Sequence, residues 1–245
     1  MAEYDNRVRS YGAAATTAVD EGLRAYMLRV YNYMLMGLGL TGATSWLAAE
    51  TPMRQVFFQV TPLGGVGLTG LGWIALFAPL GLVFWLSYRI QRMSFSTAQM
   101  VFWVYAALMG IGLAPVLLLY TGASVAQVFF ITAATFGAMS LWGYTTHRDL
   151  TGMGSFLFMG LIGIVIASLV GMFWHSSALQ WVISVAGVII FTGLTAYDTQ
   201  SIKESYYVGD DGTMAGTKAI MGALRLYLDF INLFMMLIRL LGDRR

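Results

Sequence analysis

Long, nearly continuous runs of apolar residues, separated by short polar stretches, make up most of the chain. Each run has about 20 residues, the length at which a helix crosses a hydrocarbon core about 30 Å thick. The runs predict seven membrane-spanning helices, near residues 27–49, 66–88, 98–120, 125–146, 155–174, 179–202 and 219–241. Because the runs are continuous rather than alternating, a β-barrel is excluded. The sequence therefore predicts an all-α membrane protein with seven transmembrane helices.

The first residues of the chain differ from the rest. Residues 1–19 are polar and rich in Ala and Thr, and we expect a disordered tail there. A helix is expected from Asp20, because Asp20 and Glu21 suit the exposed amide groups of a first turn. The chain is thus divided into a disordered cytoplasmic tail, 1–19, and a single seven-helix transmembrane domain, 20–245.

Composition narrows the class further. Hydrophobic residues make up 58% of the chain and charged residues 11%, whereas about a quarter of the residues in a soluble domain are charged. The chain has no cysteine, which excludes disulfides, thiolate metal sites and cysteine catalysis. The net charge of +2 is too small to indicate a nucleic-acid partner.

The distribution of positive charge predicts the orientation, because cytoplasmic connections carry an excess of Lys and Arg. The tail and alternate connections carry most of it, at Arg7, Arg9, Arg24, Arg89, Arg92, Arg148, Lys203 and Lys218. The opposite set carries only Arg54 before the C-terminus, so the N-terminus is predicted to be cytoplasmic. Seven spans then put Arg244 and Arg245 outside, against the rule. A half-inserted last segment that returns to the cytoplasm is the alternative.

Two carboxylates, Asp198 and Asp229, fall inside or at the edge of the last two apolar runs. A carboxylate in hydrocarbon costs several kcal/mol unless it is paired, protonated or wetted, and such residues usually act on ions or protons. Asp229 has Arg225 four residues before it and Asn232 three residues after it, which gives one polar stripe on the helix.

Both aspartates also have purely structural interpretations. Asp229 could form a buried ion pair with Arg225, and Asp198 could be an interfacial carboxylate that reaches water. Asp198 is expected roughly 6 Å and Asp229 roughly 15 Å from the cytoplasmic boundary, so contact between them is allowed. If they meet, the pair is expected to share a proton or to bind a cation, and two carboxylates suit a calcium ion.

The segment Tyr197–Lys203, which reads Tyr-Asp-Thr-Gln-Ser-Ile-Lys, resembles a signature of the transmembrane Bax-inhibitor-motif family, in its bacterial branch. The segment Leu226–Phe234 resembles the final-helix signature of that family, and a similar Leu-Ile-Arg-Leu-Leu run follows it. The similarity covers about residues 25–242. This resemblance implies a seven-helix bundle in which the last helix is central.

The resemblance also implies a function, a pH-sensitive calcium leak in which Asp198 and Asp229 form the sensor. In the family an arginine on the second span pairs with the first aspartate when the pore is closed. Arg89, with Arg92 nearby, is the nearest candidate, although Ser87–Arg92 does not match the arginine run of the family cleanly. Tyr197 and Asn232 are expected beside the pair. Some bacterial members instead resemble regulators of a membrane-bound quality-control protease.

Three hypotheses therefore stand side by side. The first is a calcium-permeable leak channel of the bacterial cytoplasmic membrane, gated by Asp198 and Asp229. The second is a non-conducting regulator of a membrane protease, which would use the tail, 1–19, as its contact. The third is an intramembrane aspartyl protease, but the second aspartate here lies in Tyr227-Leu-Asp229 rather than Gly-x-Gly-Asp, and no proline follows Pro115. No enzymatic activity is expected.

Few other partners are expected. His147 and His175 lie in connections on opposite sides of the membrane, so they cannot share a metal, and no phosphate-binding glycine loop is present. We expect no cofactor other than the bound or transported calcium ion, which Asp198 and Asp229 are expected to hold. The expected partners are the lipid bilayer and calcium or protons, and a monomer is compatible with the sequence.

Overall fold

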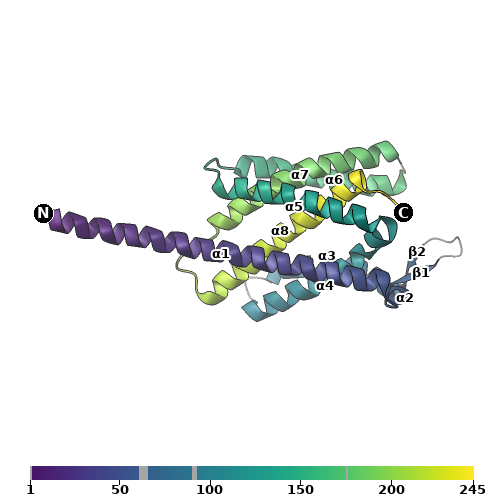
Figure 1. Ribbon diagram of the computed structural model, residues 1–245, viewed down its shortest axis with the longest axis horizontal. Coiled ribbons are helices and arrows are strands. Elements are labelled where there is room, and N and C mark those ends of the chain that lie inside the picture. The colour runs from purple at the N-terminus through teal and green to yellow at the C-terminus, as the bar shows by residue number, and fades with distance from the viewer. Residues whose placement is uncertain (1, 61–65, 90–92, 175) are drawn as a thin grey trace.

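The computed structural model describes residues 2–60, 66–89, 93–174 and 176–245. Over these ranges the chain forms a helical bundle with one short hairpin (Figure 1). In chain order the elements are α1 (Ala2–Glu50), α2 (Arg54–Phe57), β1 (Phe58–Val60), β2 (Val66–Leu68), α3 (Gly70–Arg89), α4 (Phe95–Leu119), α5 (Gly122–Thr145), α6 (Thr151–Phe173), α7 (Ser177–Glu204) and α8 (Gly212–Leu241). The all-α class predicted from the apolar runs is confirmed for these residues.

The number of spans is settled only in part. Within the described ranges, five helices are long and apolar enough to cross a membrane, namely α4 to α8. A further apolar helix, Gly70–Trp85 within α3, is shorter, and the first predicted span lies inside the long helix α1. The count of seven transmembrane helices therefore stays a prediction.

The last helix lies at the centre of the bundle. It packs against α7, α1, α5 and α4 and crosses the middle of the view in Figure 1. Of its most apolar window, 72% is buried, compared with 17% for α6. The buried side of α8 contributes Tyr227, Leu233 and Ile238 to the main apolar core. A helix with this many helical neighbours has little surface left for lipid.

The C-terminus is fixed at one end of the bundle. Thr121 donates its backbone N–H to the carbonyl of Asp243 (3.1 Å), and Arg245 donates its N–H to the carbonyl of Leu119 (2.9 Å). α8 therefore begins at the end that carries its connection with α7 and finishes beside the connection between α4 and α5. The half-inserted alternative required the last segment to turn back toward the end at which it begins. α8 does not turn back but continues as one helix from Gly212 to Leu241.

The helix ends follow ordinary capping chemistry. The side chains of Ser94, Thr121, Ser176 and Asp211 accept backbone N–H groups in the first turns of α4, α5, α7 and α8. Asp211 explains why α8 begins earlier than the predicted span, 219–241. Each cap satisfies one amide that the helix itself leaves unpaired.

The predicted second span began at residue 66, but Val66–Leu68 pair with Phe58–Val60 as a hairpin. α3 begins only after Thr69, whose hydroxyl accepts the N–H of Gly72 (3.1 Å) and donates to the carbonyl of Val56 (2.6 Å). α3 then packs against α4, with further contacts to α2 and β2. It lies at the periphery of the bundle.

α1 extends beyond the bundle at its N-terminal end (Figure 1). Its second half packs against α4 and α8, through buried residues that include Met27, Val30 and Met34. The disordered tail over residues 1–19 stays a prediction, as does the division into a tail and one domain.

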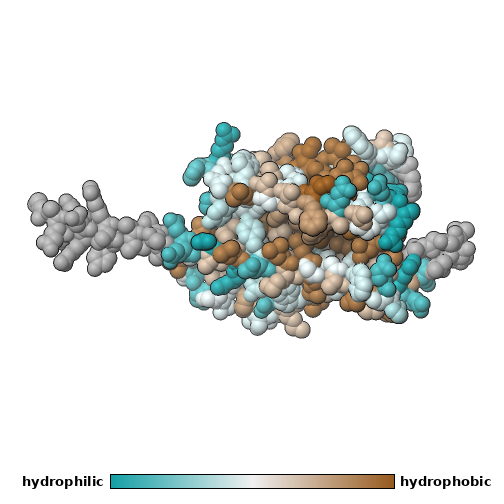
Figure 2. All heavy atoms as spheres, viewed as in Figure 1, coloured by the Kyte–Doolittle hydropathy of each residue, from teal (hydrophilic) through white to brown (hydrophobic). Residues whose placement is uncertain are grey.

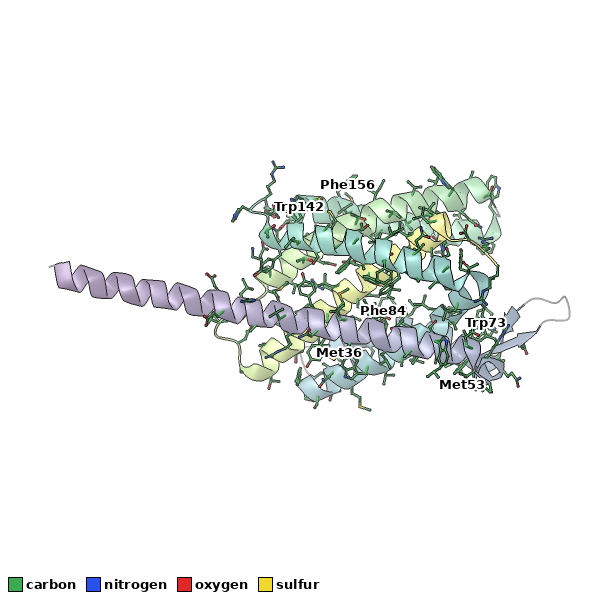
Figure 3. All side chains as sticks on the ribbon, in the orientation of Figure 1. Met36, Met53, Trp73, Phe84, Trp142 and Phe156 are labelled. Atoms are coloured by element: carbon green, nitrogen blue, oxygen red, sulfur yellow. The ribbon has the colours of Figure 1, made fainter. Side chains whose placement is uncertain are left out.

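The surface has the pattern of a membrane protein. On the face shown in Figure 2, apolar residues form a band between two hydrophilic ends. Large apolar side chains point outward from several helices, as Trp142 and Phe156 do in Figure 3. A soluble bundle would bury such side chains, whereas lipid accommodates them.

Candidate functional site

Asp198 on α7 and Asp229 on α8 meet in the interior of the bundle. α7 and α8 pack along one another, the two carboxyl groups line the same cavity, and each lies close enough to act on the other. Asp229 is buried, with 5% of its surface exposed, and Asp198 is half-buried. The structure therefore brings together the two acidic residues that the sequence singled out.

One oxygen of this pair has no protein partner. Among the described residues, no group donates a hydrogen bond to Oδ2 of Asp229, although the atom is buried. The amide of Asn232, three residues after Asp229, donates instead to the carbonyl of Leu228 (2.8 Å). An unsatisfied buried oxygen is costly, so it marks a position where a proton, a water molecule or a cation would be stabilised.

Arg225 is a cation close to this pair. It lies close enough to act electrostatically on both carboxyl groups, but its side chain is exposed. Over the described parts of the chain the one ion pair at contact distance is Lys218–Asp210 (2.6 Å). The structural ion pair considered for Arg225 and Asp229 is therefore not formed.

The arginine expected from the second span is not near the pair. Arg89 ends α3 and is exposed. α3 packs on the outer side of α4, and Arg89 does not line the cavity that contains the aspartates. The role of Arg89 as a latch therefore stays a prediction, and the position of α3 in this structure does not support it. Arg92 lies outside the described residues.

The aspartates lie on the wall of a large cavity, of about 1680 Å³. It is formed by residues of α4, α6, α7 and α8, and it extends from Tyr197 and Asp198 to Trp181 and Arg239 near the opposite end of the bundle. Arg225 and Asn232 also line it. The polar stripe predicted on α8 thus borders the cavity, where Asp229 lies beside Asp198 of α7.

Tyr197 is held by close packing. Its ring lies directly over Gly154 of α6, where a β-carbon would come within 2.5 Å of the ring carbons. A side chain at position 154 would displace Tyr197 and, with it, the neighbouring Asp198. The glycine in α6 therefore helps to position the acidic pair.

Several interior polar contacts around the site were missed by sequence reasoning. Gln200 accepts the N–H of Leu150 (2.8 Å) and donates to the carbonyl of Arg148 (2.8 Å). Ser140 and Thr199 share a hydrogen bond (2.9 Å), and both side chains are buried. The available signal was the presence of amide and hydroxyl side chains within apolar spans, since these often bond across helices.

The metal-binding capacity of the site is small. In the part of the chain that the structure describes, no group of three or more His, Cys, Asp and Glu side chains could hold a metal ion. Calcium takes six to eight oxygen ligands, so the two carboxylates would need water or backbone oxygens to complete its coordination.

The fold and the site define a helical, multi-pass membrane protein with a pair of neighbouring carboxyl groups on the wall of a large cavity that is open to one side. A family model described as "Inhibitor of apoptosis-promoting Bax1" matches residues 23–245. The chain belongs to this family, and the resemblance seen in its two C-terminal signatures is confirmed.

Relatives cover nearly the whole chain. An uncharacterized protein of Rickettsia prowazekii is 50% identical over 228 residues, which is 92% of each chain. The inner membrane protein YbhL of Escherichia coli is 47% identical over 227 residues, 91% of this chain and 94% of that protein. An uncharacterized membrane protein of Streptococcus pyogenes is 36% identical over 229 residues, 92% and 96% of the two chains.

Proposed function

We propose that this protein is a pH-sensitive, calcium-permeable leak channel, gated by Asp198 and Asp229. The observation that carries the proposal is the contact between two carboxyl groups on the wall of a cavity of about 1680 Å³. Paired carboxyl groups respond to protons and to hard cations, which are the two species that such a channel must sense and conduct.

The proposed gate works through the charge of the pair. Two carboxylates in contact repel each other unless they share a proton or bind a cation. With one shared proton, α7 and α8 stay close together through the carboxyl–carboxyl hydrogen bond. Without it, the pair either separates or accepts a calcium ion, to which the unpartnered Oδ2 of Asp229 offers a ligand.

In this proposal Arg225 is the counter-ion of the acidic pair, a role for which Arg89 was the nearest candidate on the second predicted span. Its guanidinium lies close enough to act on both carboxyl groups without an ion pair to either one. It therefore competes with the calcium ion for the deprotonated aspartates. Replacing Arg225 with Gln should raise calcium occupancy of the site, because a competing cation is removed.

The proposed membrane arrangement completes the account. α3 and the second half of α1 join α4 to α8 as seven spans, with the N-terminus in the cytoplasm by the distribution of Lys and Arg. We place the protein in the bacterial cytoplasmic membrane, by analogy with the relative that is named an inner membrane protein.

Reconstitution tests this function. Protein in liposomes that contain a calcium-sensitive dye would be compared over roughly pH 5 to pH 8, beside Asp198→Asn and Asp229→Asn. Calcium entry into wild-type liposomes should rise as the pair loses its proton, and both variants should lose this pH response. Asp149→Asn is the matched control, since it removes an exposed carboxylate outside the cavity. An unchanged pH response in both pair variants would contradict the proposal.

A regulatory function is the second candidate, and the projecting N-terminal part of α1 favours it (Figure 1). A segment that extends beyond the bundle suits contact with another membrane protein, such as a quality-control protease. Deletion of residues 1–19 should then change the activity of a co-reconstituted protease while leaving calcium entry unchanged. If folded wild-type protein shows no calcium entry above empty liposomes, this second function replaces the first.

A further inference from the structure

The cavity has a second end, opposite to the acidic pair, and that end is cationic. Arg239 and Arg244 both line it, together with Tyr120, Gln180 and Trp181. Asp198 and Asp229 are the only acidic residues in the cavity wall formed by the described residues. They are far from this end, because Asp229 lies about 15 Å from Arg239 along α8 at 1.5 Å per residue.

Neither arginine is neutralised by the protein. Over the ranges that the structure describes, the one ion pair joins Lys218 to Asp210, at the other end of the bundle. Arg239 lies in the last turn of α8, where the helix dipole favours a cation. That argument does not extend to Arg244, which lies beyond the helix.

Arg244 is held over the cavity by backbone pairing. It forms a bridge with Tyr120, and its two neighbours are also bonded to the α4–α5 region, through Asp243 to Ser124 (2.9 Å) and through Arg245 to Leu119 (2.9 Å). In extended backbone, successive side chains point to opposite sides. Accordingly, Arg244 lines the cavity, whereas Asp243 and Arg245 do not.

The walls of the cavity are apolar at their outer edges. α4 packs against α1, α3 and α8, whereas α6 packs mainly against α7. α4 and α6 therefore form two opposite walls of the cavity, and α7 and α8 line the space between them. Phe158 and Leu169 of α6 and Leu119 of α4 line it and are all more than half exposed. In a bilayer these side chains face acyl chains, so lipid has access to the cavity from the side.

We propose that this end of the cavity binds an anionic phospholipid from the leaflet in which α8 ends. The phosphate would lie between Arg239 and Arg244, with Trp181 at the level of the headgroups, where tryptophan is enriched. One acyl chain would lie in the cavity between α4 and α6. A chain that spans one leaflet reaches about 15 Å, half of the hydrocarbon thickness, which ends near the level of Asp229.

This site explains a departure from the positive-inside rule. The sequence predicts that α8 ends outside, where few arginines are expected, yet Arg239, Arg244 and Arg245 gather there. Two unpaired arginines at the mouth of a cavity would also repel a calcium ion. A bound anionic lipid would neutralise them, but its binding does not depend on conduction and can be measured without any flux.

Lipid binding can be tested on the full-length protein in detergent by native mass spectrometry. Phosphatidylglycerol and phosphatidylethanolamine with identical acyl chains would be titrated separately. We expect tighter binding of phosphatidylglycerol. Each of the substitutions Arg239→Gln and Arg244→Gln should weaken it about fivefold, and both together about twenty-fivefold. Arg245→Gln is the matched control, because it removes the same charge one residue outside the cavity, and it should change binding less than twofold.

A second variant tests the acyl-chain part of the site. Ser168 of α6 lines the cavity, so Ser168→Trp should fill it and reduce phosphatidylglycerol binding while every arginine is kept. An unchanged thermal unfolding midpoint would show that each variant is folded. Equal binding of the two lipids, an equal loss in Arg245→Gln, full binding by Ser168→Trp, or displacement of the lipid by an equal concentration of inorganic phosphate would each overturn the proposal.

Discussion

α6 and α8 are both apolar and both long enough to cross a membrane, yet they occupy opposite environments. α6 is the more apolar of the two, and 17% of its apolar window is buried inside the protein, compared with 72% for α8. Phe156 of α6 points away from the bundle (Figure 3), whereas Tyr227 of α8 is completely enclosed. The more apolar helix is thus the more exposed one, whereas in a soluble protein the more apolar helix would be the more buried one.

The difference follows from the solvent. Lipid chains are as apolar as Leu side chains, so an apolar helix gains little by leaving them, and helices associate through close packing and polar contacts instead. α8 carries Arg225, Asp229 and Asn232, which are costly in lipid. It is therefore stabilised in the interior, where these groups can find water, protons or partners. The comparison shows that the helix with the charged and amide side chains is the one the other helices enclose.

The largest expected effect on stability is the difference between substituting a glycine in the protein interior and substituting one on the lipid-facing side of α6. A β-carbon at Gly143 of α5 would collide with the backbone of Ala196 in α7, whereas one at Gly163 of α6 would meet nothing within 4 Å. Gly143→Ala should destabilise the protein by about 3 kcal/mol. Gly163→Ala should be neutral or stabilising by up to about 1 kcal/mol. Unfolding of purified protein in mixed micelles measures both, and equal effects would break the comparison.

A medium effect is expected where α7 holds the connection to α6. Gln200→Ala removes both of its hydrogen bonds to the backbone of residues 148 and 150, and it should cost about 2 kcal/mol because a buried amide is left unsatisfied. Gln127→Ala is the control, since Gln127 is exposed and has no hydrogen bond in the part of the chain that the structure describes. The same unfolding measurement applies. A loss in Gln127→Ala as large as that in Gln200→Ala would remove the role given to this contact.

A smaller effect is expected within α8 itself. The hydroxyl of Tyr227 shares a hydrogen bond with Thr41 (2.7 Å) in the core. Tyr227→Phe should destabilise the protein by about 1 kcal/mol, because Thr41 retains its second bond to the carbonyl of Ala106. Tyr88→Phe, at a position that is 87% exposed, should have no measurable effect on thermal unfolding. Stabilisation by Tyr227→Phe would contradict this account.

The smallest effect concerns Asp149, in the connection before α6. The hydrogen bonds from the side chain and backbone of Thr151 lower the pKa of the Asp149 carboxyl. Because the pKa of Asp149 is lower in the folded state, its carboxylate stabilises the folded protein. This stabilisation is fully present above the unfolded pKa of about 3.9 and is lost as pH falls through the folded pKa. The small difference between the thermal unfolding midpoints of wild type and Asp149→Asn should therefore shrink as the pH falls below about 4. A difference that grows with acidity would show the opposite sign.

Much of the helical pattern was predictable from the sequence, but its arrangement was not. α4 to α7 begin and end within a few residues of the predicted spans, because an apolar run of membrane length has few alternatives to a helix. Periodicity does not encode which helices touch, so neither the peripheral position of α3 nor which of Arg89, Arg92 and Arg225 lies beside the acidic pair could be foreseen. The pairing of Phe58–Val60 with Val66–Leu68 depends on cross-strand hydrogen bonds and on the bonds of Thr69, which a hydropathy pattern does not show.

The acidic pair was the most predictable part of the site. A carboxylate in an apolar run is so costly that two of them, on consecutive helices, are expected to share an environment. The two hydrogen bonds of Gln200 to the backbone of residues 148 and 150, and the packing of Tyr197 on Gly154, were not predictable. Neutral polar residues and glycines occur throughout the spans. Their roles depend on which atoms face them.

The most direct test of the acidic pair is an infrared difference titration of the purified protein over roughly pH 5 to pH 8. The account predicts a protonated carboxyl signal that disappears as pH rises in wild type, is altered in both Asp198→Asn and Asp229→Asn, and is unchanged in Asp149→Asn. A carboxyl signal that does not respond to pH, or that persists unaltered in both pair variants, would show that Asp198 and Asp229 share no proton and would contradict the proposed gate.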